Sequence, residues 1–147
     1  MSKKSLAIKP RFVEGYLGYL LGQANHAVYK DFDAQVRSAG LSSIEWRVLA
    51  TLHDSPALTV SDLAQQVLSK QPTVTKLVQR MVASGWLELE SDSADQRRTM
   101  VRATRAGIAC ARPLVLRARK HEAALLAALG EADAAALMSA LQKLTAL

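Results

Sequence analysis

The clearest pattern of apolar and polar positions lies between Ser69 and Gly85. Apolar residues are spaced three and four apart there, so they share one face of a helix: Val74, Leu77, Val78 and Met81. The opposite face carries hydrogen-bond donors that suit base edges and phosphates: Gln71, Thr73, Lys76, Gln79 and Arg80. Because glycine favours the left-handed cap of a helix, Gly85 is expected to end it.

Two short strands are predicted after this helix, at Trp86–Glu90 and Thr99–Ala103. Leu87 and Leu89 alternate with glutamates, which is typical of a half-exposed strand. The loop between the strands reads SDSADQRR and ends in paired arginines. A donor-rich helix followed by a hairpin with a basic tip indicates a winged helix-turn-helix. Its helix enters the major groove and its loop reaches the neighbouring backbone or minor groove.

Two capped helices are predicted before the donor-rich helix. Ser42 to Glu45 forms a capping box, and Thr59 to Asp62 repeats the pattern. The segment HDSPAL between them is expected to be a loop broken by Pro56. The buried faces are predicted at Ile44, Val48, Leu49 and Leu52, and at Leu63, Ala64 and Val67. The helix that begins at Thr59 and the donor-rich helix then form the helix-turn-helix.

Long helices are predicted at both ends of the chain. The first starts at Pro10 and closes at Gly40, and Gly15, Gly18 and Gly22 within it indicate either close packing of another helix or added flexibility. Its apolar stripe is Val13, Leu17, Leu20, Ala24, Val28 and Phe32. Thr104 caps a helix to about Leu129 that kinks at Pro113, and the last helix covers Glu131–Leu147.

These stripes exceed what the small helix-turn-helix can cover, so a homodimer built from the chain ends is expected. The predicted fold class is mainly α (α+β), a winged helix-turn-helix with long N- and C-terminal dimerisation helices. Residues 1–147 form a single domain, in which 10–40 and 105–147 dimerise and 42–104 form the DNA-binding lobe.

Composition agrees with a nucleic-acid partner. The 147 residues carry a formal charge of +6 and a sequence pI of about 9.8, which favours a polyanion. One cysteine excludes an internal disulfide framework and is typical of the reducing cytosol. Residues 1–9 are predicted to be a basic tail without a signal sequence. No apolar run reaches the roughly 18 residues of a membrane span, so we expect a cytoplasmic protein with no membrane partner.

From about residue 10 to 146, the sequence resembles the MarR family of bacterial transcription regulators. Asp92-Ser-Ala-Asp95-Gln-Arg97 and the Val101 to Gly107 stretch are similar to the family's Asp-Pro-x-Asp-x-Arg…Val-x-Leu-Thr-x-x-Gly signature. Ser93 replaces the common proline and Ala103 the usual leucine. The stretch from Pro72 to Arg80 is similar to the family's recognition helix.

The resemblance implies a dimer that binds a pseudopalindromic operator, usually as a repressor, with recognition helices about 34–36 Å apart. It implies that Arg97 enters the minor groove while the Asp95 carboxylate braces its guanidinium. The candidate DNA contacts are Lys70, Gln71, Thr73, Thr75, Lys76, Gln79 and Arg80 on the helix, and Asp95, Arg97 and Arg98 on the wing. The alternative for one part of the helix is a face that is only solvated and does not contact DNA; it consists of Lys76, Gln79 and Arg80.

The resemblance also implies an effector cleft walled by the first, second and fifth helices. Its candidates here are Tyr19, His26, Trp46, Arg47 and His53. Trp46 and Arg47 would stack on an aromatic ring and pair with its carboxylate. The expected effector is a small aromatic anion, either a phenolic acid or an aromatic acyl-CoA thioester. The alternative places Trp46 in the core and gives the histidines structural roles.

Two other functions stay open. Cys110 lies between Arg105 and Arg112, which would lower the pKa of a redox-sensing thiol, although a buried inert thiol is the alternative. The second open function is that of a ligand-independent architectural or protein-interaction module. His121-Glu122 does not make a metal site, and no nucleophile–base pair or phosphate loop stands out. We therefore expect no enzyme activity, no metal and no cofactor.

Overall fold

The computed structural model describes residues 9–147, so most of the predicted basic tail, residues 1–8, lies outside the described residues. The chain is mainly helical with a small antiparallel sheet, which confirms the predicted fold class. The elements are η1 (Phe12–Gly15), α1 (Leu17–Ser38), α2 (Ser43–Leu52), β1 (Leu58–Thr59), α3 (Val60–Gln66), α4 (Gln71–Ala83), β2 (Leu87–Ser91), β3 (Thr99–Ala103), α5 (Arg105–Leu129) and α6 (Glu131–Thr145).

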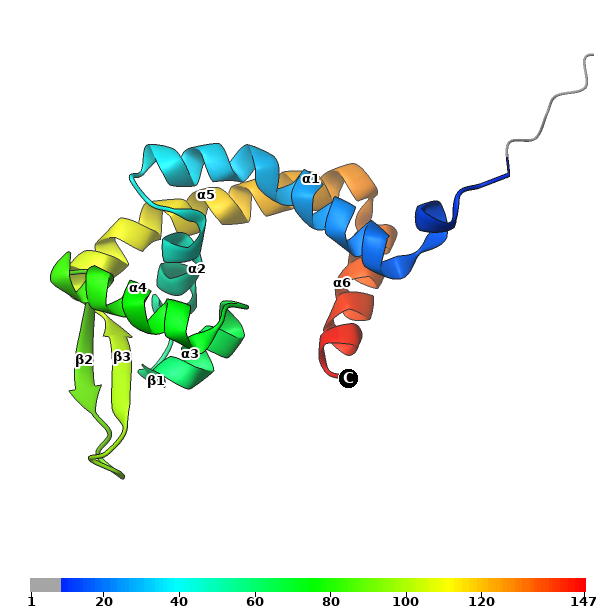
Figure 1. Cartoon of the computed structure of the whole chain (residues 1–147). Coiled ribbons are helices and arrows are strands. Elements are labelled where there is room, and N and C mark those ends of the chain that lie inside the picture. The colour runs from blue at the N-terminus through cyan, green and yellow to red at the C-terminus, as the bar shows by residue number, and fades with distance from the viewer. Residues whose placement is uncertain (1–8) are drawn as a thin grey trace, which may run out of the picture.

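Helices α1 and α5 lie side by side as a long base, and the other elements hang from its two ends (Figure 1). A lobe built from α2, α3, α4 and the sheet lies below one end. Helix α6 turns away from α5 at the other end, because Gly130 adopts φ +86° between them. The lobe and the exposed terminal helices are therefore separate regions of the molecule.

Local capping signals place the lobe helices as predicted. The Glu45 N–H donates to Ser42 Oγ at 3.3 Å, and the Ser42 N–H donates to Glu45 Oε2 at 2.8 Å. The Thr59 hydroxyl accepts from the Asp62 N–H at 3.1 Å. The predicted apolar faces meet in one core, in which each of the following is at most 2% exposed: Val48, Leu49, Leu52, Leu63, Val67, Val74, Leu77, Val78 and Met81.

The sheet contains a strand that the sequence pattern did not predict. Its order is β1-β3-β2, and β1 pairs Leu58 with Val101 and Thr59 with Met100. The prediction that HDSPAL is entirely loop is therefore wrong at Leu58. A two-residue strand is too short to show alternation, so only its partner reveals it. Strand β2 starts at Leu87 rather than Trp86, and β3 has the predicted bounds.

The first helix does not start at Pro10 as predicted. A short 3₁₀ helix, η1, ends at Gly15, and Tyr16 is extended with φ −83° and ψ 119° before α1 begins at Leu17. Within the predicted stripe of α1, Phe32 is buried, but Leu17 is 57% exposed and Leu20 46% exposed. The N-terminal half of this stripe has no cover within the single chain.

Helix α5 passes through Pro113 without ending, as expected. Gly130 then separates it from α6, and the two helices are bent by 116° relative to each other. Over residues 9–147, no single helix is long and apolar enough to cross a membrane, and α5 and α6 pass that test only as a bent pair.

Candidate functional site

Helix α4 presents a polar face to solvent. Its apolar residues Val74, Leu77, Val78 and Met81 are buried. The predicted contact residues are exposed at Lys70, Gln71, Thr73, Lys76, Gln79 and Arg80. Thr75 is half-buried, and its hydroxyl donates to the Gln71 carbonyl at 2.9 Å. The exposed face is therefore available to a ligand, whereas the Thr75 hydroxyl already has a partner within the helix.

The start of α4 suits an anion. No side chain caps it, and Pro72 occupies its first turn. Unpaired N–H groups and the positive end of the helix dipole favour a phosphate at such a position. The turn from α3 is held by Leu68, which has φ +56° and is 85% exposed. A left-handed leucine costs about 1–2 kcal/mol, so the turn between α3 and α4 is locally strained.

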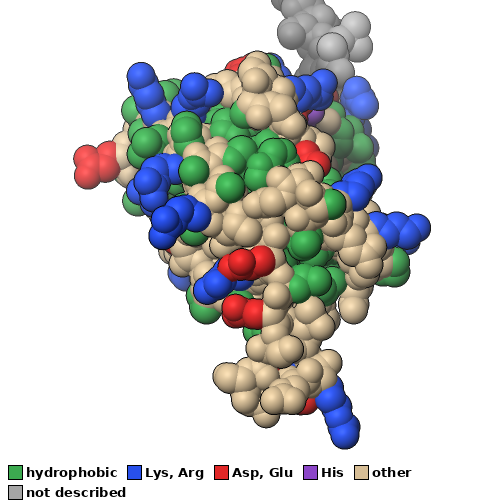
Figure 2. Space-filling view, turned by 90° about the vertical axis from the view of Figure 1, so that its left-hand side faces the viewer, with side chains coloured by type: hydrophobic (Ala, Val, Ile, Leu, Met, Phe, Trp, Pro, Cys, Tyr) green, Lys and Arg blue, Asp and Glu red, His purple; other side chains and the backbone are tan. Residues whose placement is uncertain are grey.

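The wing tip is closed by two aspartates. Asp92 Oδ1 accepts from the Ala94 N–H and Asp95 Oδ1 from the Arg97 N–H, each at 3.0 Å. The carboxylate of Asp95 thus braces the backbone of Arg97, which corrects the expectation that it pairs with the guanidinium. Over residues 9–147, that guanidinium forms no ion pair, while Arg98 Nη1 lies 4.0 Å from Asp92 Oδ2. The hairpin projects from the lobe and carries a basic side chain near its tip (Figure 2).

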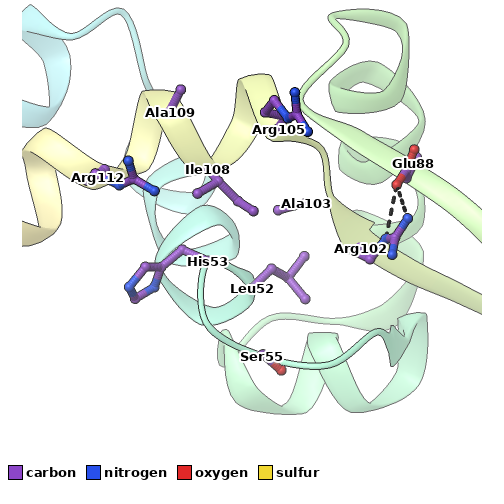
Figure 3. A pocket seen from close by; sticks show the side chains of 10 residues that line it. All are labelled: Leu52, His53, Ser55, Glu88, Arg102, Ala103, Arg105, Ile108, Ala109 and Arg112. Atoms are coloured by element: carbon purple, nitrogen blue, oxygen red, sulfur yellow. Dashed lines mark hydrogen bonds and ion pairs between the residues drawn. The ribbon is translucent and has the colours of Figure 1, made fainter.

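The base of the wing is tied to the end of α4 and the start of α5. The Thr104 hydroxyl donates to the Gly85 carbonyl at 2.6 Å and accepts from the Gly107 N–H at 3.0 Å. Arg102 Nε donates to Glu88 Oε1 at 3.0 Å. This hydrogen bond, with the charges of Glu88 and Glu90, raises the pKa of Arg102. The Thr104 contacts therefore fix the wing relative to the end of α4, and the Arg102–Glu88 pair joins the two strands of the wing (Figure 3).

The five predicted effector residues do not meet in one place. Tyr19 and His26 are exposed on α1, and neither lines the two clefts described below. Arg47 Nη1 donates to the Val67 carbonyl at 2.8 Å. Arg47 therefore ties α2 to the end of α3, and it does not line the cleft between α2 and α5 described next.

Trp46 and His53 do line a common cleft of about 300 Å³ between α2 and α5. Trp46 is 7% exposed, and its ring packs against Phe32 with centroids 5.5 Å apart. His53 Nδ1 lies 3.0 Å from the Ala50 carbonyl oxygen and 3.3 Å from Asp54 Oδ1. The cleft is completed by Ala50, Val115, Ala118, Arg119 and Glu122. It combines an aromatic wall with both charge signs.

Arg119 was missed by the sequence reasoning. In the sequence Arg119 looks like one of several basic residues on the solvated side of α5, and only its spacing of seven from Arg112 marks it.

A second cleft of about 340 Å³ lies between α1, α5 and α6, and it is largely apolar. There His121 Nε2 is 2.9 Å from the Val28 carbonyl oxygen, and the histidine ring stacks on Phe32. His121 therefore has a structural role in joining α5 to α1.

Cys110 is half-buried, and burial raises the pKa of its thiol above the ordinary value. The prediction that Arg105 and Arg112 lower this pKa is therefore wrong. A thiol that stays protonated reacts slowly, which argues against a redox sensor at this position.

In the part of the chain that the structure describes, no group of three or more His, Cys, Asp or Glu side chains could hold a metal ion.

Comparisons with known proteins agree with this geometry. Residues 39–98 match the model of a family described as "MarR family". The MarR family transcriptional regulator SPO1453 from Silicibacter pomeroyi DSS-3 has a similar structure, with TM-score 0.84 and 39% identity over 92% of this chain and 97% of that one. BpsR of Bordetella bronchiseptica, whose DNA binding is regulated by 6-hydroxynicotinic acid, has TM-score 0.78 and 25% identity over 93% and 98% of the two chains.

The chain is also similar to two curated transcriptional repressors. The repressor NicR of Pseudomonas putida is 26% identical over 98% of this chain and 95% of its own length. The repressor IacR of the same species is also 26% identical, but over 65% of this chain, and the match spans only 57% of IacR.

Proposed function

Since the chain belongs to the MarR family of transcription regulators, we propose that it is a homodimeric repressor that binds a pseudopalindromic DNA operator and is released by a small aromatic anion. The observation that carries this proposal is the pairing of two exposed elements on one lobe. These are the donor face of α4 and a projecting wing whose Arg97 guanidinium has no ion-pair partner within residues 9–147.

The chemistry of both elements suits duplex DNA. Lys70 and Lys76 flank the first turns of α4, where uncapped N–H groups favour a phosphate. Arg97 extends from a tip whose backbone Asp95 holds in place. An arginine presented in this way is attracted by the strong negative potential of a narrow A·T minor groove. Helix α4 then positions donors at base edges in the adjacent major groove.

The terminal elements supply the surface for a second copy. Large apolar side chains are exposed along η1, α1, the middle and end of α5, and α6: Phe12, Tyr16, Leu17, Leu20, Val28, Leu116, Leu129, Leu137, Met138 and Leu144. Exposed apolar surface concentrated at one region of a chain is typical of an interface. A dimer formed there would hold two copies of α4 at a set distance, which a pseudopalindromic operator requires.

The cleft lined by Trp46, His53 and Arg119 is the proposed effector site. It lies where α2 of the lobe packs against α5 of the base. If the lobe takes two positions relative to the base and the ligand binds one of them more tightly, binding shifts the population toward that position. Trp46 offers a surface for an aromatic ring, and Arg119 a donor for a carboxylate. The regulation of BpsR by 6-hydroxynicotinic acid supports an aromatic acid. A phenolic acid and an aromatic acyl-CoA thioester both fit this description.

A gel shift at fixed salt tests the proposal. The labelled DNA is the segment upstream of the protein's own gene, and the control is random DNA of equal length and composition. Specific binding is expected to exceed non-specific binding by about 10³-fold or more. Equal affinity for the two DNAs would instead identify an architectural or protein-interaction module. A thermal-shift screen of phenolic acids and their coenzyme A esters then tests the effector class.

A further inference from the structure

A hollow of about 320 Å³ lies where the wing meets the start of the helix-turn-helix. Three segments contribute to it: the chain entering α3, the first residue of α4 and the chain entering β3. The lining residues are Thr59, Val60, Ser61, Gln71, Arg98 and Thr99. No carboxylate is among the described side chains that line it. This junction hollow therefore presents hydrogen-bond donors and one positive charge to solvent.

The pairing of β1 with β3 creates the junction hollow. Thr59 pairs with Met100 in the sheet, and Thr59 is also the residue that caps α3. The chain therefore enters α3 directly beside the first residues of β3. Ser61 in the first turn of α3 and Thr99 at the start of β3 are both exposed there. Their relative position is set by the sheet rather than by the mobility of a loop.

Arg98 supplies the positive charge. Its N–H donates to the Asp95 carbonyl, and its carbonyl accepts from the Asp92 N–H, each at 3.0 Å, so the backbone that carries the side chain is held. The side chain is 55% exposed, and its one ion-pair contact within residues 9–147 is the 4.0 Å approach of Nη1 to Asp92 Oδ2. An exposed ion pair contributes little free energy, so the guanidinium can turn to a stronger anion.

The neutral donors of the junction hollow also lack partners. The Thr59 hydroxyl already accepts from the Asp62 N–H at 3.1 Å. Within residues 9–147, the hydroxyls of Ser61 and Thr99 and the side-chain amide of Gln71 form no hydrogen bond. Hydroxyl, amide and guanidinium groups are the side-chain donors that proteins direct at DNA phosphates.

The place of the junction hollow in the lobe relates these donors to duplex DNA. In the proposed function, α4 enters the major groove and the wing reaches the adjacent minor groove. Two adjacent grooves are separated by a ridge, and that ridge is a sugar–phosphate backbone. The junction hollow lies between the start of α4 and the wing, since Gln71 and Thr99 both line it. It therefore faces the ridge.

We propose that the junction hollow seats one backbone phosphate of the operator, with Arg98 as its charged partner and the hydroxyls of Ser61 and Thr99 as neutral donors. The proposal rests on the proposed function and adds Ser61 and Thr99 to the residues that contact DNA. Arg98 binds the backbone, whereas Arg97 extends into the minor groove. Because a phosphate is the same at every base pair, this contact sets the position of α4 and the wing on the duplex and carries no sequence information.

Operator duplexes with methylphosphonates test this assignment, because the methyl group removes the charge of one chosen phosphate. The DNA is the segment upstream of the protein's own gene, and the substitution is moved through equivalent positions of its two half-sites. Gel shifts measure the affinity of the full-length protein and of Arg98→Ala, Ser61→Ala and Thr99→Val. The matched control is Ser84→Ala, which removes an exposed hydroxyl at the opposite end of α4. Melting temperatures verify that each variant is folded.

Arg98→Ala is expected to weaken operator binding by about tenfold or more, and Ser61→Ala and Thr99→Val by about three- to fivefold each. Ser84→Ala should bind as the wild type does. At one position, the methylphosphonate should weaken the wild type by about tenfold but Arg98→Ala little further, because that phosphate has already lost its charged partner. Binding to random DNA should fall by similar factors, and only Arg98→Ala should reduce the dependence of affinity on salt.

Additive effects of Arg98→Ala and the methylphosphonate at every position would overturn the proposal, since no phosphate would then contact this arginine. Unchanged affinity in both Ser61→Ala and Thr99→Val, or an equal loss in Ser84→Ala, would overturn it as well. The same gels compare wild-type binding to upstream and random DNA. Equal affinity for these two DNAs refutes the proposed repressor itself, whereas a clear preference together with additive effects refutes only the phosphate site.

Discussion

Replacing Gly107 with alanine tests how the wing is joined to the lobe. Gly107 is buried in the first turn of α5, beneath the Thr104 cap. A Cβ atom added there would lie 2.2 Å from the Trp86 carbonyl oxygen, 3.1 Å from the Trp86 carbonyl carbon and 3.4 Å from Leu49 Cδ2. The first of these is far below any ordinary contact, and its partner is backbone rather than a side chain that can rotate. Either α5 or the chain at Trp86 must therefore shift.

The sign of the change in the free energy of unfolding distinguishes this steric contact from the effect of helix propensity. Propensity alone would make Gly107→Ala stabilising by about 1 kcal/mol. Overpacking against a rigid partner costs about 1–3 kcal/mol. The shift also disturbs the Thr104 N–H bond to the Trp86 carbonyl at 3.0 Å and the Gly107 N–H bond to Thr104 Oγ1 at 3.0 Å, each worth about 1 kcal/mol. The net expectation is a loss of about 1–3 kcal/mol in the free energy of unfolding.

Urea denaturation at fixed protein concentration measures this loss. The control is Ala106→Gly at the exposed neighbouring position. The stability that this variant loses measures the helix propensity of alanine over glycine in the same turn, with the sign opposite to that expected for Gly107→Ala from propensity alone. A neutral or stabilised Gly107→Ala protein would refute the close approach of α5 to Trp86. Because the wing leaves the lobe at this junction, operator affinity is expected to fall together with stability.

Four further predictions concern three single side chains. Arg97→Ala should weaken operator binding by about 1–3 kcal/mol at fixed salt without lowering the melting temperature, because the side chain is exposed; an equal loss in Arg117→Ala would point to general charge instead. Trp46→Ala should reduce the free energy of unfolding by about 3–5 kcal/mol, since it empties a buried aromatic site against Phe32; a loss below about 1 kcal/mol in urea denaturation would show that Trp46 is not part of the core. The raised pKa of Cys110 keeps its thiol protonated near pH 7.5, so a disulfide reagent should modify it more slowly than free cysteine, with the rate rising as pH increases. Cys110→Ser should leave operator binding unchanged with or without peroxide, and a peroxide response lost in this variant would restore the redox hypothesis.

The sequence alone determined the features that depend on near neighbours in the chain. The apolar face of α4 is set by spacing, and Val74 and Leu77 are buried where the spacing places them. Ser42 and Glu45 form their capping box within one turn. Gly85 adopts φ +80° where the helix was expected to end. Each signal is local, because periodicity and capping involve residues at most a few positions apart.

Only the tertiary structure decided which partner each side chain meets. Strand β1 exists because β3 pairs with it, and two residues carry no periodic signal of their own. Arg47 is directed to the Val67 carbonyl, which lies 20 residues further along the chain. The cleft between α2 and α5 likewise needs both helices in place, since Trp46 lies on α2 and Arg119 on α5. Such contacts depend on how distant segments pack, and that geometry is a property of the whole core rather than of any local pattern.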